Sequence, residues 1–289
     1  MNLSSSQEES DIENGQVDAP LLSIITVSFN AARFIEQAID SVANQTYDDV
    51  EFVVIDGGSS DGTLEIIRRN ETKIDFWSSE PDGGIYDAMN KGVAVARGEW
   101  LYFLGADDYL WNENVLARLA PVLKATTRER VVYGQVTRLL ENGEALDVEG
   151  RPWPQVRARF LSQMMIPHQG AFHHRSLFAR EGFDTSFRIA GDYEFLLRHL
   201  RNHNALFIPE MVAAMRLSGI SSDNRNRLRA LRECLRARRK LGITRFPARL
   251  YWNLTKLIAR LMIARVLGDH AGQNAANLYR VLRGHKPIK

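Results

Sequence analysis

The sequence has a single cysteine, Cys234, among its 289 residues. One thiol cannot form a disulfide within the chain, and it cannot build a zinc site without further ligands. Any bound metal must therefore be held by oxygen ligands or histidines, as Mg²⁺ and Mn²⁺ commonly are. The near absence of cysteine fits a reducing compartment, so we expect a cytoplasmic protein.

Long apolar runs are also missing from the first part of the chain. The longest early run, residues 21–29, is interrupted by Ser and Thr and is much shorter than the ~20 residues of a membrane-spanning helix. Residues 1–19 are polar and acidic, without the basic start and apolar core of a secretory signal, so we expect a disordered tail. The remaining composition, 45% hydrophobic and 25% charged, is that of a globular protein.

Acidic residues are scarce towards the C-terminus. Residues 225–289 hold 17 Lys and Arg against two acids, Glu233 and Asp269, although the whole chain carries a net charge of only +2. Such an asymmetry separates a basic segment from an acidic remainder. We therefore predict a disordered tail over 1–19, a main folded domain over 20–223 and a basic helical extension over 224–289.

Strands and helices alternate in the predicted first half. Strands are expected at 22–29, 51–56, 74–77 and 99–104, with helical patterns after the first two and again over 85–96. This alternation predicts an α/β fold with a Rossmann-like, mostly parallel sheet and flanking helices. Ligands of such sheets bind beyond the carboxyl ends of the strands, where polar or glycine-rich segments lie at 28–30, 56–61 and 105–108.

The pattern changes in the second half. Residues 131–140 and 144–148 flank Asn142-Gly143, which predicts a hairpin. A helix over 155–165, a strand over 169–174, a helix over 192–199 and a strand over 205–217 follow, and residues from Asn224 onward are expected to be helical.

Two adjacent carboxylates, Asp107 and Asp108, follow the fourth predicted strand. Adjacent carboxylates repel each other, and a Mg²⁺ or Mn²⁺ ion bridging a diphosphate would neutralise them. The alternative is an acidic turn that caps a helix over 112–124.

Residues 56–63 form a glycine-rich loop between a strand and a helix. The loop has neither the GxGxxG pattern nor the lysine of a phosphate-binding loop, which excludes NAD binding and a P-loop NTPase. Asp56 is a candidate acceptor for a base N–H or a ribose hydroxyl, whereas Asp61 is expected to cap the next helix.

Two further segments carry candidate groups. Asp192 lies at the start of a predicted helix, either to favour the helix dipole or to act as a general base on an attacking hydroxyl. His168 either packs structurally or reaches a phosphate or sugar.

Together these segments resemble the inverting family 2 glycosyltransferases of the GT-A fold. The resemblance covers about residues 20–222, and no single motif carries it, but the ordered set is specific. The matching pieces are residues 23–30, Gln45-Thr46-Tyr47, 55–63, 82–92, 105–108 and 191–194.

The resemblance implies roles for individual residues. Phe29 would lie against the nucleobase, Asp56 would bind it, and Asp82 would line the nucleoside pocket. Asp107 would face the ribose, Asp108 would hold the metal, and Asp192 would be the catalytic base. We also expect donor contacts from Ser28, Asn30, Gly58, Asn90, Lys91 and His168.

Three positions depart from the family pattern. Gly105 and Gly57 stand where a further acid is common, and Gly191 replaces the usual Glu before the base. These departures bear on metal affinity and nucleobase choice more than on the reaction class.

The expected partners are a nucleotide-sugar donor, with UDP preferred, and a glycan or lipid-linked acceptor. Residues 245–266 predict a basic amphipathic helix on an anionic membrane surface, at the inner face of the cell membrane. The alternatives are a helix packed on the catalytic domain and, ranked lowest, nucleic-acid binding, for which no motif is present.

Two other functions fit the same fold class. One is a catalytically inactive module that binds a sugar nucleotide or glycan. The other is a nucleotidyltransferase, whose glycine-rich basic loop is missing from residues 28–33.

Overall fold

The computed structural model describes residues 19–140, 142–217 and 224–244, together with Tyr251, Trp252, Leu254, Thr255, Ile258, Ala259 and Met262. Its strands are β1 (Leu22–Ser28), β2 (Val50–Asp56), β3 (Phe76–Ser79), β4 (Trp100–Gly105), β5 (Tyr109–Leu110), β6 (Val131–Leu139), β7 (Ala145–Glu149), β8 (Ala171–His174) and β9 (Leu206–Arg216). Its helices are α1 (Ile35–Ala43), α2 (Thr63–Arg69), α3 (Ile85–Val95), α4 (Val115–Ala125), α5 (Trp153–Phe160), α6 (Gly191–Leu200) and α7 (Asn224–Lys240), with short 3-10 turns at Glu71–Lys73, His168–Gly170 and Arg175–Phe178.

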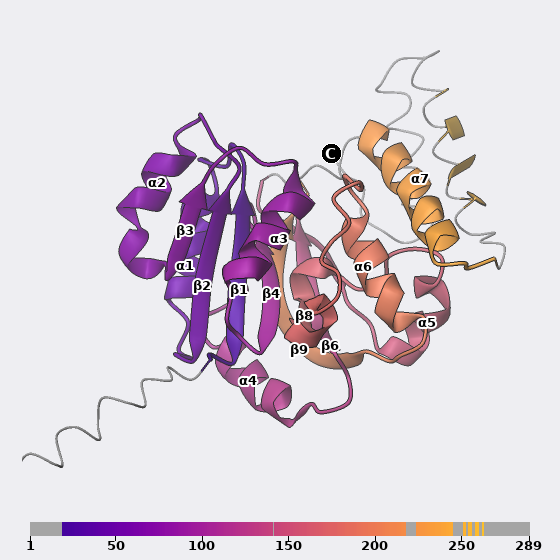
Figure 1. Ribbon diagram of the computed structural model, residues 1–289, viewed down its shortest axis with the longest axis horizontal. Coiled ribbons are helices and arrows are strands. Elements are labelled where there is room, and N and C mark those ends of the chain that lie inside the picture. The colour runs from indigo at the N-terminus through magenta and orange to yellow at the C-terminus, as the bar shows by residue number, and fades with distance from the viewer. Residues whose placement is uncertain are drawn as a thin grey trace, which may run out of the picture.

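One sheet organises the molecule (Figure 1). The strand order is β3-β2-β1-β4-β8-β6-β9-β5, and β7 pairs with β6 beside this path. The first four strands run parallel, and β8 continues the sheet antiparallel to β4. The carboxyl ends of β1, β2, β3 and β4 therefore meet at one edge, as the alternation of strands and helices predicts.

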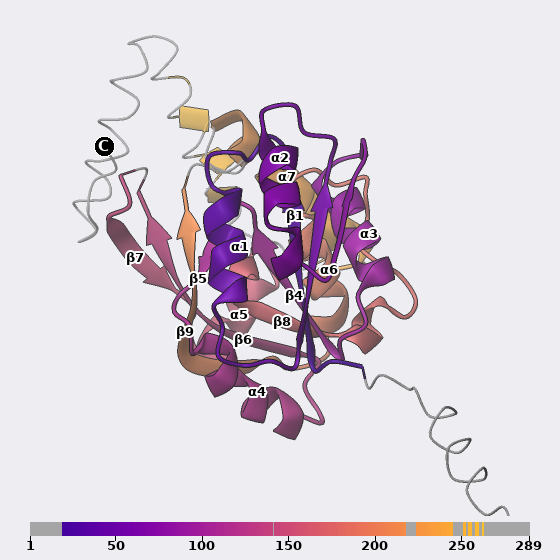
Figure 2. The ribbon, with the colours of Figure 1, turned by 90° about the vertical axis from the view of Figure 1, so that its left-hand side faces the viewer.

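Apolar side chains cover both faces of the sheet. One core joins Ile25, Val53 and Phe103 to α3, α5, α6 and α7, and the other joins Ile24 and Phe52 to α1, α2 and α4. Figure 2 shows α1 and α3 at different sides of the strands. Buried strands of this kind have few polar positions because helices lie on both faces.

Most predicted elements are confirmed, including the hairpin, in which Gly143 adopts a positive φ of 83°. Several boundaries differ, among them the start of β8, which is Ala171 because residues 168–170 form a 3-10 turn. The third strand is Phe76–Ser79. Ile74, which the prediction placed in the strand, follows a 3-10 turn and packs into the core from there. The helix predicted over 155–165 ends at Phe160, where the Arg238 guanidinium donates to the Leu161 carbonyl.

The first helix of the predicted basic extension packs on the rest of the molecule. α7 contacts α6, and Cys234 and Ala237 are buried in the same core as the sheet residue Phe103. The segment 245–266 lies mostly outside the described residues. Among the helices that the structure describes, none has the length and apolar character to cross a bilayer.

Candidate active site

The carboxyl ends of the parallel strands gather the predicted donor-binding segments. Ser28, the last residue of β1, lies beside Asp56 in the register of β2, and Asp56 in turn lies beside Ser79. On the other side, Val27 lies beside Gly105, which precedes Asp107 and Asp108. The topology thus brings three separate sequence segments to one edge.

Asp56 is fully buried and organises the loop that follows β2. Its Oδ1 accepts hydrogen bonds from the hydroxyls of Ser28 (2.9 Å) and Ser59 (2.5 Å). Its Oδ2 accepts from the Ser79 hydroxyl (2.7 Å) and from two backbone N–H groups, those of Gly58 (3.1 Å) and Ser59 (2.9 Å). Burial raises the pKa of Asp56, but these hydrogen bonds outweigh it and leave the pKa below its usual value.

Both oxygens of Asp56 are therefore occupied by the protein itself, and its predicted contact with a nucleobase stays a prediction. Gly58 has a φ of 81°, which glycine adopts without steric cost. Asn30 closes the loop from the β1 side: its N–H donates to the Ser59 hydroxyl (2.8 Å), and its Oδ1 accepts from the Ser60 N–H (3.0 Å).

Phe29 and Asp82 approach each other over Gly57. The Phe29 side chain is 65% exposed, as expected of a surface against which a base stacks. A Cβ added at Gly57 would lie 2.5 Å from Asp82 Oδ2 and 3.4 Å from Phe29 Cδ2. The Asp82 carboxylate thus occupies the space that a side chain at position 57 would need.

The turn that carries Asp82 is fixed by several neighbours. Asp82 Oδ1 accepts from the Gly84 N–H (2.7 Å), and the Arg188 guanidinium donates to the Gly83 carbonyl. Lys91 pairs with Glu80 (2.8 Å) and donates to the Pro81 carbonyl (3.3 Å). The Glu80 contact raises the pKa of Lys91.

Asn90 has a structural contact at both ends of its amide. Its Nδ2 donates to the Phe183 carbonyl (2.9 Å), and its Oδ1 accepts from the Phe183 N–H (2.8 Å). These bonds attach the loop before α6 to α3. They do not support the predicted contact of Asn90 with the donor, because the amide is already engaged.

Asp107 and Asp108 form an electrostatically strained pair after β4. Asp108 is 2% exposed, and its Oδ1 accepts from the Arg216 N–H (2.9 Å). Burial and the neighbouring Asp107 charge raise the pKa of Asp108 well above its usual value, and burial also raises the pKa of Asp107. The helix-capping alternative is wrong for both residues, because β5 intervenes and Asn114 precedes α4.

The two carboxylates share a space that could hold a cation. A Cβ at Gly105 would lie 2.6 Å from Asp108 Oδ2 and 3.0 Å from Asp107 Oδ1. Oxygens of both residues therefore face the same small volume. Burial raises the pKa of both carboxyls, and the charge of Arg216 opposes this rise. No cluster of three or more His, Cys, Asp or Glu ligands occurs among the described residues. The pair thus fits an ion whose remaining ligands come from a diphosphate or water.

Arg216 is a site residue that the sequence argument missed. Its guanidinium donates to the Asp107 carbonyl (2.7 Å) and to Gln37 Oε1 (2.6 Å), and it lies over the rings of Phe34 and Tyr109. The only sequence signal was a basic residue near the end of the strand predicted over 205–217. Nothing local connects it to a pair of aspartates more than a hundred residues earlier.

Asp192 lies in the first turn of α6, as predicted, and is half-buried. The Tyr86 hydroxyl donates to the Ile189 carbonyl (2.7 Å) and lies 3.3 Å from Asp192 Oδ1. Burial and the Asp192 charge raise the pKa of Tyr86, which keeps its hydroxyl a donor. A Cβ at Gly191 would lie 2.7 Å from the Tyr86 ring, so this ring occupies the place of a side chain at position 191.

His168 is buried against aromatic side chains. Its ring stacks on Phe103 at 5.5 Å, and neither ring nitrogen has a hydrogen-bond partner among the described residues. Burial lowers the pKa of His168, against the opposing charge of Asp192, so the imidazole is neutral at pH 7. Its predicted contact with a phosphate or sugar stays a prediction.

Glu233 of α7 holds the backbone that leads to Asp192. The Glu233 carboxylate is 7% exposed and accepts from three consecutive N–H groups, those of Arg188 (3.1 Å), Ile189 (2.9 Å) and Ala190 (2.9 Å). From the sequence, Glu233 could be recognised only as one of the two acids after Asn224, and its contact with residues 188–190 could not be predicted.

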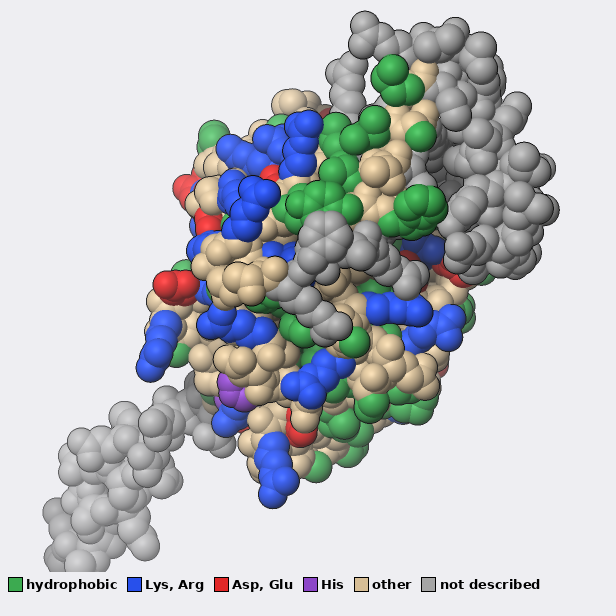
Figure 3. Space-filling view, turned by 90° about the vertical axis from the view of Figure 1, so that its right-hand side faces the viewer, with side chains coloured by type: hydrophobic (Ala, Val, Ile, Leu, Met, Phe, Trp, Pro, Cys, Tyr) green, Lys and Arg blue, Asp and Glu red, His purple; other side chains and the backbone are tan. Residues whose placement is uncertain are grey.

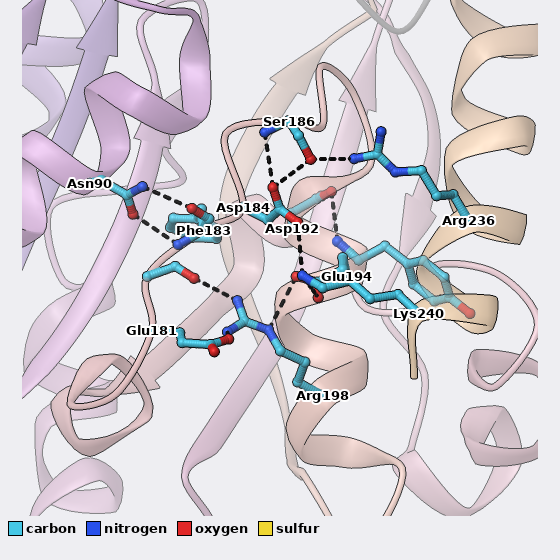
Figure 4. Close-up of polar contacts among 12 residues, drawn as sticks. Asn90, Glu181, Phe183, Asp184, Ser186, Asp192, Glu194, Arg198, Arg236 and Lys240 are labelled. Atoms are coloured by element: carbon cyan, nitrogen blue, oxygen red, sulfur yellow. Dashed lines mark hydrogen bonds and ion pairs between the residues drawn. The ribbon is translucent and has the colours of Figure 1, made fainter. Parts of the chain in front are cut away.

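A second set of contacts attaches α7 to the same loop (Figure 4). Lys240 binds Asp184 (2.8 Å) and the buried Glu194 (3.0 Å). Arg198 of α6 binds Glu194 (3.1 Å) and Glu181 (3.1 Å). The Lys240 and Ser186 contacts hold the pKa of Asp184 down at about 2, although burial opposes them. The loop before the candidate base is therefore anchored by α6 and α7 together.

Comparison with known proteins identifies the family to which the sequence is similar. The family model described as glycosyl transferase family 2 matches residues 23–187. A PGL/p-HBAD biosynthesis glycosyltransferase of Mycobacterium bovis is 37% identical over 191 residues, which are 64% of this chain and 71% of that protein.

Two solved structures share the architecture. The mannosyltransferase PcManGT from Pyrobaculum calidifontis, in complex with GDP-Man and Mn²⁺, has a TM-score of 0.60 at 19% identity and covers 94% of this chain and 78% of its own. S. aureus TarS in complex with UDP has a TM-score of 0.58 at 18% identity and covers 83% and 71%. At these identities the likeness shows the fold, and it confirms the GT-A architecture expected from the sequence.

Proposed function

This chain belongs to glycosyl transferase family 2, and from that premise we propose an inverting, metal-dependent transfer of a sugar from a nucleotide sugar to an acceptor hydroxyl. UDP is the proposed nucleotide, in keeping with TarS bound to UDP. The acceptor belongs to a bacterial glycolipid or polysaccharide, as the name of the mycobacterial relative suggests.

The proposed reaction is a single displacement at the anomeric carbon. The acceptor oxygen forms a bond to that carbon while the bond to the diphosphate oxygen breaks, and the nucleoside diphosphate leaves. Asp192 takes the proton of the attacking hydroxyl. Because attack and departure occur on opposite faces of the sugar, the anomeric configuration inverts.

Asp107 and Asp108 would hold the divalent ion, Mg²⁺ or Mn²⁺. When bound, the ion would stabilise the negative charge of the leaving diphosphate. On the protein side, Phe29 offers an exposed ring for the base. The Gly84 N–H binds Asp82, and Arg188 binds the carbonyl of the neighbouring Gly83. Lys91 fixes the turn that carries Asp82, and its contact with the donor stays a prediction.

One observation carries the proposal: a continuous set of contacts joins the candidate base to the candidate donor site. Tyr86 contacts both Asp192 and Ile189, and the adjacent Arg188 binds the turn beside Asp82. Both groups lie near the carboxyl edge of the sheet, where an α/β protein binds its ligands.

The substitution Asp192→Asn tests the proposal. It keeps the size of the side chain and removes its basicity, so we expect normal folding and a loss of transfer of about 10²–10⁴-fold, the usual contribution of a general base. Product formation from a panel of nucleotide sugars, with NMR of the anomeric linkage, measures both rate and stereochemistry. Asp40→Asn on α1, a surface ion-pair residue, serves as the control.

Wild-type turnover in Asp192→Asn would remove Asp192 from this role. Retention of the donor's anomeric configuration would overturn the single displacement. The absence of any transferred sugar across the panel, together with tight binding of a nucleotide sugar, would instead favour the inactive binding module.

A further inference from the structure

A hollow on the exposed side of α7 takes no part in the transfer described above. Its volume is about 410 Å³, within the ~300–1,000 Å³ range of ligand pockets. We call it the arginine pocket, and its lining residues are Ser186, Leu228, Arg229, Arg232, Glu233 and Arg236. They come from α7 and from the loop that precedes α6.

The charge of the arginine pocket is strongly positive. Arg229, Arg232 and Arg236 are three and four residues apart on α7, which places their side chains on one face of the helix. Glu233 is the single acid of the lining, and the N–H groups of residues 188–190 occupy its carboxylate. Figure 3 shows Lys and Arg side chains gathered over the described part of this side of the molecule, with few acidic ones.

Arg232 and Arg236 have no carboxylate partner among the described residues. Within the ranges that the structure describes, the one ion pair in the pocket joins Arg229 to Glu233 at 3.5 Å. Arg236 donates to the Ser186 hydroxyl (2.6 Å) and lies 3.7 Å over the Phe187 ring, and it points towards the loop in Figure 4. Clustered like charges destabilise a helix, so an anion in the pocket would relieve this cost.

The chemistry of the lining favours a phosphate. Guanidinium groups present planar pairs of donors that match phosphate oxygens, and their bonds to phosphate are strengthened by charge. Leu228 gives the pocket one apolar wall, whereas the Ser186 hydroxyl already donates to Asp184 Oδ1 (2.5 Å) and accepts from Arg236 (2.6 Å). This combination suits a phosphate or diphosphate group attached to an apolar chain better than a free carboxylate.

The location points to the acceptor and not to the donor. None of the candidate donor residues Phe29, Asp82 and Asp108 lines the pocket. Its Glu233, in contrast, binds the N–H of Ala190, two residues before the candidate base Asp192. A ligand held here therefore lies next to the segment that presents the base.

We propose that the arginine pocket binds a phosphate or diphosphate group carried by the acceptor, and so holds that acceptor near Asp192. The proposal rests on the function proposed above, because it presumes that Asp192 receives an acceptor hydroxyl. It identifies the acceptor as a phosphorylated compound with an apolar portion.

A binding experiment tests the site without catalysis. Inorganic pyrophosphate is titrated into the full chain by calorimetry in EDTA at constant ionic strength, so that no ion bound by Asp107 and Asp108 contributes. We expect binding that Arg232→Gln weakens about tenfold, as the loss of a charge-assisted bond implies. Arg239→Gln removes the same charge from the same helix outside the pocket lining, and we expect less than a twofold effect.

A kinetic experiment tests the link to the acceptor. Two acceptors with the same sugar are compared, one joined to a prenyl chain through a diphosphate and the other an uncharged alkyl glycoside. We expect Arg232→Gln to raise the KM of the first about tenfold, with unchanged KM values for the second and for the donor. Arg239→Gln should leave all three KM values unchanged.

Other results would overturn either the proposal or the function on which it rests. Equal effects of Arg232→Gln and Arg239→Gln on pyrophosphate binding or on the two acceptors would show that general charge, not the pocket, matters. Binding to vesicles of anionic lipid that requires Arg232, without pyrophosphate binding, would assign the pocket to a membrane surface. Transfer that proceeds normally while Arg232→Gln has no effect leaves the proposed function intact, whereas pyrophosphate binding without any transfer overturns only that function.

Discussion

At the scale of single residues, the Asp107-Asp108 pair lowers the stability of the fold while it serves the proposed function. Burial and the Asp107 charge disfavour the ionised form of Asp108. The raised pKa of Asp108 in the fold means that its ionisation reduces the free energy of unfolding as the pH rises above about 4, the ordinary Asp value.

We therefore predict that Asp108→Asn melts at a higher temperature than the wild type at pH 7 and loses transfer by about 100-fold or more. The amide oxygen can still accept from the Arg216 N–H, so the fold keeps that contact. Thermal melts at pH 4 and pH 7 measure the stability, and the gain should be larger at pH 7. A lower melting temperature at pH 7 would contradict the assignment of strain to this residue.

Gly57 provides a second residue-scale prediction. A methyl group at position 57 would meet the Asp82 carboxylate at 2.5 Å, and Asp82 is a flexible side chain that can turn away. We expect Gly57→Ala to weaken donor binding about tenfold, whereas the free energy of unfolding should change by only ~0.5 kcal/mol. Gly83→Ala is the matched control, because its added methyl would meet only ordinary contacts at 3.5 Å and beyond. Equal donor affinities of the two variants would argue against Asp82 as a donor ligand.

Residue types at the strand ends could be predicted from the sequence, but their partners could not. The pattern of 56–61 and 105–108 identified the ligand edge because parallel strands place their carboxyl ends together. The same pattern could not show that Asn90 binds Phe183, since that contact spans 93 positions and leaves no local signature. Asp56 likewise has no sequence feature that distinguishes a ligand from a group that stabilises its own loop.

At the scale of elements, α7 positions the candidate base through Glu233. The substitution Glu233→Gln replaces one of the two acceptor oxygens by a donor that faces backbone N–H groups. We expect kcat to fall about tenfold with an unchanged donor KM, and the free energy of unfolding to fall by ~1–3 kcal/mol. Steady-state kinetics separates the two parameters, because loss of a positioning contact acts on turnover more than on donor binding.

Glu181→Gln is the control for this prediction. Glu181 is an exposed partner of Arg198, and exposed ion pairs contribute little to stability. A parallel fall in kcat for both variants, or a rise in donor KM for Glu233→Gln alone, would show that α7 does not act on Asp192.

The elements themselves were more predictable than their ends. Apolar periodicity identified α3 and β4, because both bury one continuous set of side chains. It placed the third strand two residues early, since Ile74 is buried from a turn. The boundary predicted at Asn224 rests on charge, and charge does not show that Cys234 and Ala237 of α7 enter the core.

At the scale of the whole molecule, the donor site is expected to depend on a divalent ion. Without it, the carboxylates of Asp107 and Asp108 would repel the diphosphate of the donor. We predict that EDTA abolishes transfer and that Mn²⁺ or Mg²⁺ restores it. A nucleotide sugar should raise the melting temperature only when the ion is present, because a ligand that binds only the native state stabilises it.

The corresponding control is Asp108→Asn, whose melting temperature with the donor should not respond to Mn²⁺. Full transfer in EDTA would show that Asp107 and Asp108 do not require an ion. A donor-induced shift of equal size with and without Mn²⁺ would lead to the same conclusion.

The support that Glu233 gives to residues 188–190 has a practical consequence for hybrid enzymes. The family match ends at residue 187, so an exchange of the matched block alone would join a foreign loop to a native Asp192 and a native α7. Exchanges intended to change the sugar should therefore have their junction after α7. Glu233, the backbone of residues 188–190 and Asp192 then all come from the same parent.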